Sequence, residues 1–226
     1  MKIGILQTGR SPEEIQGTYG DYDGFFVELL KERGFEFKNY PVLDGVFPSD
    51  PSDAEGWLIT GSRFGVYEDH DWIPPLEDFL RATYAKGVPI VGICFGHQIL
   101  AQALGGKIEK FDGGWSVGPQ KYQSEVFGEQ NIIAWHQDQV VERPADAEVI
   151  GSSDFCENAF LAYGNKALTV QPHPEFTAEF FADLLATRGK NLPEEIRQEA
   201  MAKDSEGLTS LAFADQIEKF FKAERT

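Results

Sequence analysis

Short apolar runs alternate with stretches of helical periodicity through the first half of this chain. Residues 21–33 and 76–86 each place aromatic and leucine side chains at helical spacing, and each stretch is followed by a glycine. Segments that read as strands come after both of them, at 35–40 and 88–93. Strands that alternate with helices in this order favour a parallel sheet. The pattern therefore predicts an α/β fold with a mostly parallel central sheet and helices on both faces.

The pattern changes after Leu104, where the extended segments become shorter and are separated by glycines. This change predicts a small antiparallel or mixed extension of the sheet. The segments span residues 107–110, 121–126, 131–135 and 148–150. Two further helices are predicted at 193–203 and 208–222. We expect residues 1–190 to form one domain and residues 191–226 to form a helical segment packed on that same domain.

The joint between the run at 88–93 and the helix that follows it carries a cysteine, Cys94. A strand that turns sharply into a helix exposes the residue at the turn, and the free N–H groups of the helix favour an anion there. Such a turn leaves no room for flanking side chains, and Gly92 and Gly96 meet that requirement. The joint therefore predicts that Cys94 is a nucleophile. A lone cysteine can instead be a buried core residue without a catalytic role. The presence of a partner base elsewhere in the sequence would favour the catalytic interpretation.

His173 and Glu175 follow an apolar run that reads as a strand near the end of the chain. Residues two apart in an extended chain point the same way, so Glu175 can fix the tautomer of His173 and stabilise its protonated ring. His173 would then take the proton of the Cys94 thiol. A simple turn, marked by Pro172 and Pro174, is the alternative interpretation. With Cys94, the two residues predict a Cys-His-Glu triad.

The segments Gly92-Ile-Cys-Phe-Gly-His-Gln98 and Gln171-Pro-His-Pro-Glu175 together resemble the class I glutamine amidotransferases. The similar branch of that family holds the glutaminase domain of GMP synthase and the γ-glutamyl peptidases. The resemblance starts at the first strand, residues 2–8, passes through 57–62 and continues to a terminal helix. It implies a flavodoxin-like core in an amidotransferase-like catalytic domain. It also implies hydrolysis of a γ-glutamyl amide through a γ-glutamyl thioester on Cys94.

This mechanism requires hydrogen-bond donors for the negative charge that develops on the amide oxygen. The backbone N–H of Phe95, next to the predicted nucleophile, is one such donor. The resemblance implies that the second donor comes from the loop at 60–65, where Gly61 or Ser62 would supply it. Ser62 and Arg63 stand where the family usually has a second glycine and a proline, so the identity of this donor stays open.

The resemblance further implies a set of substrate-binding residues. Gln98 lies one helical turn beyond Cys94, so its amide would reach over the same pocket. The segment at 135–140 is similar to a histidine-bearing loop of the family, whose backbone would meet the substrate near His136 and Gln137. Trp115 lies in a Gly-Trp segment like that of the γ-glutamyl peptidases and would form a wall of the pocket. Neither a metal nor an organic cofactor is implied.

The charge and the cysteine content narrow the partners and the compartment. A net charge of −17 at pH 7 disfavours nucleic acid and anionic membranes, because both would repel the chain. The two cysteines, Cys94 and Cys156, show no disulfide or zinc spacing, and the residues around Cys156 favour burial. No segment suits a membrane span or a signal peptide. We therefore expect a cytoplasmic enzyme that acts on a small-molecule substrate.

Three hypotheses about function follow. The first is a glutaminase whose ammonia feeds a separate synthase subunit, such as that of GMP synthase, and the second is a freestanding γ-glutamyl peptidase. The chain shows neither a phosphate-binding glycine loop nor room for a synthase domain, which favours an autonomous enzyme or a separately encoded subunit. The third is a catalytically silent binding module. The presence of Cys94, His173 and Glu175 disfavours that third hypothesis.

Overall fold

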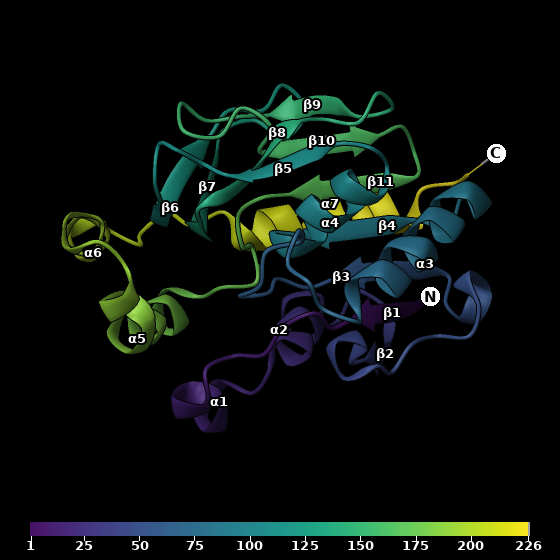
Figure 1. Ribbon diagram of the computed structural model, residues 1–226, viewed down its shortest axis with the longest axis horizontal. Helices are drawn as coiled ribbons and strands as arrows, with labels where there is room; N and C mark the ends of the chain where they lie inside the picture. Colours follow the sequence, from purple (N-terminus) through teal and green to yellow (C-terminus); the bar gives the residue numbers. More distant parts are fainter. Residues whose placement is uncertain (226) are drawn as a thin grey trace.

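The computed structural model describes residues 1–225 and is built on a central seven-stranded sheet. Figure 1 shows this sheet crossing the molecule between layers of helices. In spatial order the strands are β2 (Glu36–Tyr40), β1 (Lys2–Leu6), β3 (Gly56–Ile59), β4 (Ile90–Ile93), β11 (Ala167–Val170), β10 (Phe160–Tyr163) and β9 (Glu148–Gly151). The strands from β2 to β11 in this order pair in parallel. β10 pairs antiparallel with β11, and β9 pairs antiparallel with β10. The prediction of a mostly parallel sheet is confirmed.

Two antiparallel strand pairs form the predicted extension beside the central sheet. They are β5 (Lys107–Lys110) with β8 (Asp138–Glu142), and β6 (Ser116–Tyr122) with β7 (Gln130–His136). Both pairs lie near β9 and β10 in Figure 1. The prediction of a small antiparallel or mixed section is therefore confirmed as well.

One strand of this extension differs from its predicted position. The sequence pattern predicts a strand at 121–126, but β6 starts at Ser116 and ends at Tyr122. Gly118 and Pro119 lie inside β6, and these two residue types obscure the pattern of a strand. After β6 the Ser124 hydroxyl accepts hydrogen bonds from two following backbone N–H groups, so the chain turns there.

Helices cover both faces of the central sheet, as the alternating pattern predicts (Figure 1). α3 (Ile73–Lys86) and α4 (Phe95–Ala103) pack on one face, and α2 (Tyr22–Leu29) and α7 (Ser210–Lys222) pack on the other. The apolar side chains of α7, including Phe213, Ile217 and Phe221, are buried in the same cluster as Ile3 and Ile5 of β1. The C-terminal helix thus contributes directly to the core of the sheet.

Two helix ends differ from the periodic pattern. α2 ends at Leu29 and not at residue 33, because the chain then turns through Glu32 and Gly34, which have φ angles of 61° and 72°. α3 starts at Ile73, before the predicted start at residue 76, because proline is tolerated in the first turn of a helix. Prolines inside a helical pattern therefore concealed its true beginning.

A third group of helices lies at the left and lower left of Figure 1, below β6 and β7. It consists of α1 (Glu13–Tyr19), α5 (Ala178–Arg188) and α6 (Glu194–Ala202). Their apolar side chains share one cluster with Val117 of β6 and Ile133 of β7. Short 3₁₀ helices occur at Val42–Asp44, Pro51–Asp53 and Gly189–Asn191.

Within residues 1–225, no helix combines the length and the apolar character needed to cross a membrane.

Candidate active site

Four loops meet at the carboxyl edge of the central sheet. They follow β1, β3, β4 and β11, which are neighbours in the sheet although they are far apart in the sequence. In open parallel sheets the carboxyl ends of the strands lie at one edge, and ligands bind there. These loops carry Thr8, Gly61, Cys94 and His173. The order of the strands, and not closeness in the sequence, brings these residues together.

Cys94 lies at the sharp turn between β4 and α4, which we call the elbow. Its φ is 52° and its ψ is −100°, a backbone conformation that residues with side chains rarely adopt. A Cβ on Gly92 would lie 2.5 Å from the carbonyl oxygen of Gly96, and a Cβ on Gly96 would lie 2.6 Å from the carbonyl oxygen of Ile59. Both distances are too short for a real side chain. The two glycines therefore permit the elbow.

His173 and Glu175 reach the elbow from the loop after β11. His173 Nδ1 lies 2.7 Å from Glu175 Oε1, and both side chains are almost fully buried. The backbone N–H of His173 donates to the carbonyl oxygen of Ile133 at 2.8 Å, which ties the loop to β7. The ring of Phe176 stacks on the imidazole, with ring centroids 4.1 Å apart. The imidazole is thus held at Nδ1 and covered on one face.

The side chains of His173 and Cys94 lie close enough to interact electrostatically. Burial by itself lowers the pKa of His173, but the Glu175 carboxylate and Cys94 raise it above its ordinary value. A protonated imidazole beside a sulfur stabilises negative charge on that sulfur by electrostatic attraction. The arrangement can therefore supply a nucleophilic sulfur and a proton donor. The structure brings together the three residues that the two sequence motifs name.

Gly61 approaches both of these side chains from the loop after β3. A Cβ on Gly61 would lie 2.8 Å from His173 Cε1 and 3.8 Å from Cys94 Cβ. The Thr8 hydroxyl lies 2.9 Å from the carbonyl oxygen of Thr60 and 3.2 Å from that of Gly61, so it fixes the path of this loop. The loop can approach the elbow closely because residue 61 has no side chain.

The predicted oxyanion donors flank the same space. Phe95 is the first residue of α4, and its N–H has no partner within the helix. Neither this N–H nor that of Ser62 donates a backbone hydrogen bond in the part of the chain that the structure describes. Their assignment as oxyanion donors, together with Gly61, stays a prediction.

Gln171, to which the sequence analysis assigns no role, also reaches the Cys94 sulfur. Its Nε2 lies 3.6 Å from Cys94 Sγ, and its Oε1 accepts a hydrogen bond from Gln98 Nε2 at 3.1 Å. Gln98 Nε2 also donates to the carbonyl oxygen of Asp138 at 2.9 Å. The Gln98 amide is thus engaged inside the protein. Its predicted contact with a substrate stays a prediction.

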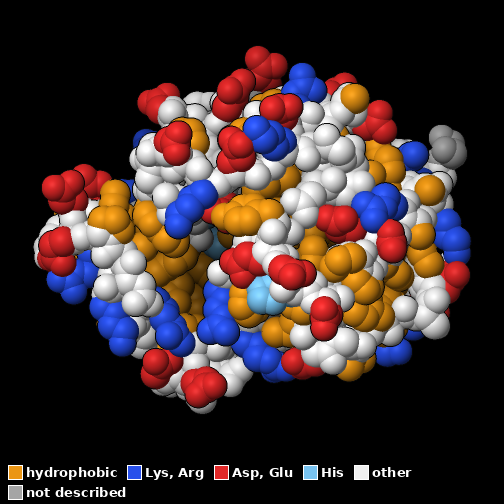
Figure 2. Space-filling view, viewed as in Figure 1, with side chains coloured by type: hydrophobic (Ala, Val, Ile, Leu, Met, Phe, Trp, Pro, Cys, Tyr) orange, Lys and Arg blue, Asp and Glu red, His pale blue; other side chains and the backbone are white. Residues whose placement is uncertain are grey.

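A cavity of about 940 Å³ opens beside His173. Figure 2 shows a hollow on the side of α5 and α6, with hydrophobic side chains on its wall and Lys and Arg side chains at its rim. The predicted residues Trp115 and Ser62 line the cavity, whereas Gln98, His136 and Gln137 do not. Further lining residues, which the sequence did not indicate, are Arg10, Glu14, Tyr22, Trp135, Phe176 and Arg188.

Three arginines line this cavity although the chain as a whole carries a net charge of −17. Arg188 pairs with Glu14 at 3.1 Å. The Arg63 guanidinium lies 4.9 Å from the centroid of the Phe64 ring and forms no ion pair within residues 1–225. The position where the sequence departs from the family pattern therefore presents a positive charge to the cavity.

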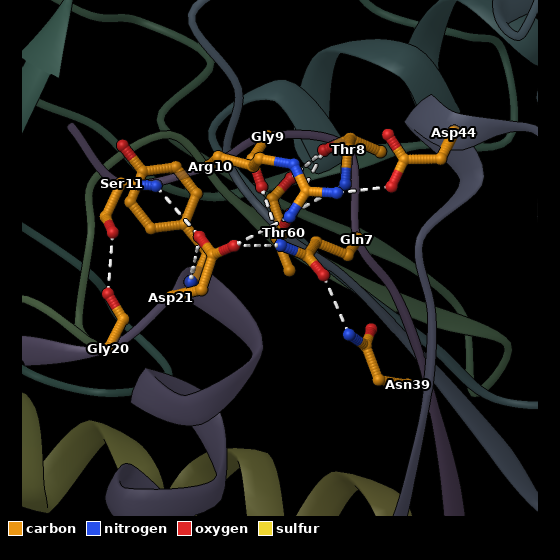
Figure 3. A network of polar contacts seen from close by, with 11 residues as sticks. Gln7, Thr8, Gly9, Arg10, Ser11, Gly20, Asp21, Asn39, Asp44 and Thr60 are labelled. Carbon is orange, nitrogen blue, oxygen red and sulfur yellow. Dashed lines mark hydrogen bonds and ion pairs between the residues drawn. The ribbon is translucent and has the colours of Figure 1, made fainter. Parts of the chain in front are cut away.

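The third arginine, Arg10, is held by the polar network that Figure 3 shows around the loop after β1. Arg10 forms ion pairs with Asp21 and Asp44. Asp21 also accepts hydrogen bonds from the Ser11 N–H and from Gln7 Nε2, each at 2.9 Å. Because Asp21 caps the N-terminus of α2, one carboxylate connects the cavity wall, the sheet and a helix.

His136 and Gln137 lie at the end of β7, where their side chains contact other parts of the protein. His136 Nδ1 lies 3.3 Å from the carbonyl oxygen of Asp138, and Gln137 Nε2 donates to that of Phe111 at 3.4 Å. Burial and the nearby His173 lower the pKa of His136 to about 3, so its ring is neutral. Contact of these two residues with a substrate stays a prediction.

The other cysteine, Cys156, is buried in the core, and burial raises the pKa of its thiol to about 12. A thiol in this state is a poor nucleophile, in agreement with its interpretation as a structural residue. Across residues 1–225, no group of three or more Cys, His, Asp and Glu side chains gathers in a way that could hold a metal ion.

Known proteins are similar to this chain in sequence and in fold. A family model described as glutamine amidotransferase class-I matches residues 27–188. Gamma-glutamyl peptidase 4 of Arabidopsis thaliana is 33% identical over 183 residues, which cover 74% of this chain and 73% of that protein. A glutamine-hydrolyzing GMP synthase subunit of Methanopyrus kandleri is 30% identical over 191 residues, which cover 75% of this chain and 95% of the relative. A crystal structure of a glutamine amidotransferase from Thermotoga maritima has the same fold, with a TM-score of 0.75 at 19% identity and 99% coverage of both chains.

Proposed function

Because this chain belongs to the class-I glutamine amidotransferase family, we propose that it hydrolyses a γ-glutamyl amide through a thioester on Cys94. The observation that carries the proposal is the proximity of Cys94 and His173, which both border Gly61, with the ring of His173 held by Glu175. The peptidase and GMP synthase relatives support amide hydrolysis as the reaction class.

In the first half of the reaction, the Cys94 thiolate attacks the γ-carbonyl carbon and the amide oxygen takes the negative charge. The N–H of Phe95, with that of Gly61 or Ser62, would stabilise this oxyanion. When the tetrahedral intermediate collapses, the C–N bond breaks and protonated His173 gives its proton to the leaving nitrogen. The γ-glutamyl thioester and a free amine or ammonia are the products of this half.

In the second half, water attacks the thioester carbonyl and neutral His173 takes one proton from that water. The C–S bond then breaks, glutamate leaves, and the thiolate and imidazolium are restored. Glu175 holds Nδ1 of the ring throughout, so that Nε2 is the nitrogen that exchanges the proton.

The cavity favours a freestanding γ-glutamyl peptidase over an ammonia donor. Its volume of about 940 Å³ is near the upper end of typical ligand sites, whereas glutamine releases only ammonia. Trp115 and Trp135 line it beside His173, so a leaving group larger than ammonia has space and apolar surface there. Supply of ammonia to a separate synthase subunit is the second candidate, which the GMP synthase relative supports.

The experiment is a screen of glutamine and γ-glutamyl dipeptides against the purified protein alone, with released glutamate as the readout. We expect cleavage of at least one γ-glutamyl dipeptide by the wild type and by Cys156→Ser, and none by Cys94→Ser. A covalent γ-glutamyl adduct on Cys94, trapped by acid quench and located by peptide mass, would support the thioester. Silence toward all these compounds, reversed by a synthase subunit from the same cell, would favour the ammonia donor instead.

A further inference from the structure

Gln171 has an unusual position in the candidate active site, because its carboxamide faces the sulfur of Cys94 from inside the protein. Its side chain is fully buried, and its Nε2 lies 3.6 Å from Sγ, within hydrogen-bond distance for sulfur. Its backbone N–H donates to the carbonyl oxygen of Ala159 at 2.8 Å, so the residue is fixed to the chain just before β10 ahead of the turn to His173. A donor in this position is aligned with the nucleophile before any substrate enters.

The orientation of the Gln171 amide follows from its neighbours. One end of the Gln98 amide lies 2.9 Å from the carbonyl oxygen of Asp138, which can only accept, so this end must be Nε2. The same Nε2 faces Gln171 at 3.1 Å, so the facing atom of Gln171 must be its oxygen. The nitrogen of Gln171 is then the atom directed at Cys94. A fixed carbonyl thus sets the direction of two successive amides.

We propose that Gln171 is a catalytic residue that donates a hydrogen bond to the Cys94 thiolate, and that Gln98 is the positioning residue that aims it. The proposal rests on the proposed function only in that Cys94 is its nucleophile. A hydrogen bond to the charged form of a group stabilises that form. Gln171 therefore stabilises the sulfur at the two points where it is a thiolate, before it attacks the amide and when it leaves the thioester.

The role differs from that of the oxyanion donors, which face the substrate oxygen. Gln171 does not line the cavity, so a contact with substrate does not explain its buried amide. The role also gives Gln98 a function that differs from its predicted contact with substrate. The hydrogen bonds form one chain inside the protein, in which Gln98 donates to Gln171 and Gln171 donates to the sulfur of Cys94.

The test measures the thiolate directly, without a substrate. We would follow the rate of Cys94 alkylation by iodoacetamide against pH, with the label located by peptide mass. Gln171→Met keeps the length of the side chain but removes the donor, and it should move the midpoint of the profile upward by about one pH unit. Gln98→Met should move it in the same direction by less, because the Gln171 donor is loosened but still present.

Other titratable groups near the sulfur do not obscure this measurement. The titratable groups that interact electrostatically with Cys94 include His173, Tyr22, Tyr122 and Cys156. Burial raises the pKa of both tyrosines and of Cys156, so these three groups keep their protons through the neutral range. His173 is unchanged in the variants compared, so its effect on the profile is common to all of them.

Gln130→Met is the matched control, because Gln130 is a buried glutamine whose Nε2 donates to the carbonyl oxygen of Phe127 and not to sulfur. It should leave the profile unchanged. If Gln171→Met does not fold, Gln171→Asn keeps a polar group that is too short to reach Sγ. A profile of either folded Gln171 variant that superimposes on that of the wild type overturns the proposal.

The outcome is separable from that of the proposed function. A shifted profile in a protein that cleaves no γ-glutamyl compound would support the role of Gln171 at the sulfur and count against the proposed reaction. Cleavage with an unshifted profile would do the reverse. If both hold, Gln171→Met should lower kcat by roughly tenfold while KM stays close to that of the wild type, because the lost hydrogen bond is to the nucleophile.

Discussion

Two adjoining buried regions hold the same kinds of side chain, a cysteine and a histidine, in different surroundings. At the elbow, Cys94 faces His173, and the interior around Asn158 holds Cys156 and His97. All four side chains belong to residues that are at most 5% exposed. In the interior, burial lowers the pKa of His97 to about 3 and raises that of Cys156 to about 12, so both are neutral. At the elbow, Glu175 and Cys94 raise the pKa of His173 in spite of burial.

Burial by itself therefore does not decide which cysteine can react. Cys94 has a strained backbone, a nearby protonated imidazole and an amide donor, whereas Cys156 is buried in an apolar cluster. Within residues 1–225 no hydrogen bond joins Cys156 to a histidine. A buried group loses its charge unless a fixed partner compensates the lost hydration. The difference between the two regions lies in the partners, and each partner can be removed separately.

Replacement of each cysteine by serine should give the largest difference in activity. Cys94→Ser should lower the γ-glutamyl hydrolase activity by roughly 10⁴-fold or more, because the nucleophile is lost. Cys156→Ser should stay within about twofold of the wild type in the folded protein. A glutamine-analogue electrophile should label only Cys94, as determined by peptide mass. Label on Cys156 alone would contradict the distinction between the two regions.

Removal of the partners of Cys94 should have the next largest effect. His173→Ala should reduce kcat by roughly 10³- to 10⁴-fold, since proton transfer is lost. Glu175→Gln should retain more activity than His173→Ala, because it weakens only the orientation and stabilisation of the imidazolium. Steady-state kinetics with one γ-glutamyl substrate tests this order. Equal rates of the wild type and His173→Ala would remove His173 from the mechanism.

The strained backbone of the elbow can be tested through its glycines. Gly96→Ala places a Cβ 2.6 Å from the carbonyl oxygen of Ile59, so we expect a loss of about 2–3 kcal/mol in the free energy of unfolding, with a loss of activity. Gly17→Ala, in helix α1, meets nothing within 4 Å and should instead gain about 0.5–1 kcal/mol. Urea unfolding of both variants measures the difference. Equal stability would show that the elbow is not tightly packed.

The buried histidine His97 should have an effect that appears only at acid pH. His97 has a pKa of about 3 in the folded protein, whereas an unfolded histidine titrates near 6.5. The unfolded state therefore binds the extra proton first. The free energy of unfolding is unaffected by this group above about pH 6.5 and falls toward pH 3 by at most about 1.4 kcal/mol per pH unit.

His97→Gln should flatten this acid dependence in urea unfolding between pH 7 and pH 4.5. His173→Gln should not flatten it, because the pKa of His173 is shifted in the other direction. If the slope in His97→Gln equals that of the wild type, His97 is not held neutral by burial. The contrast between the two regions would then rest on the cysteines alone.

The local pattern of the sequence was sufficient for the fold class and for the elbow. The alternation of strands and helices predicts the α/β fold, and Gly92 and Gly96 mark the turn at Cys94 because a tight turn excludes side chains within a few residues. Gly61, in the loop that the family resemblance implies, lies beside His173 and Cys94, while its role and that of Phe95 as oxyanion donors stay predictions. These features depend on residues that are close in the chain or on motifs that keep their own spacing.

Only the tertiary structure decided what surrounds Cys94. Gln171 lies in the motif at 171–175. Its contact with the sulfur nevertheless depends on β4 and β11 being neighbours and on Gln98 holding its amide. The cavity likewise lies between α1, α5 and the β6–β7 pair. The sequence does not indicate that these three parts pack against one another. Periodicity records which face of an element is buried, but not which element covers it. The strand order and the side-chain contacts across it therefore had to come from the folded chain.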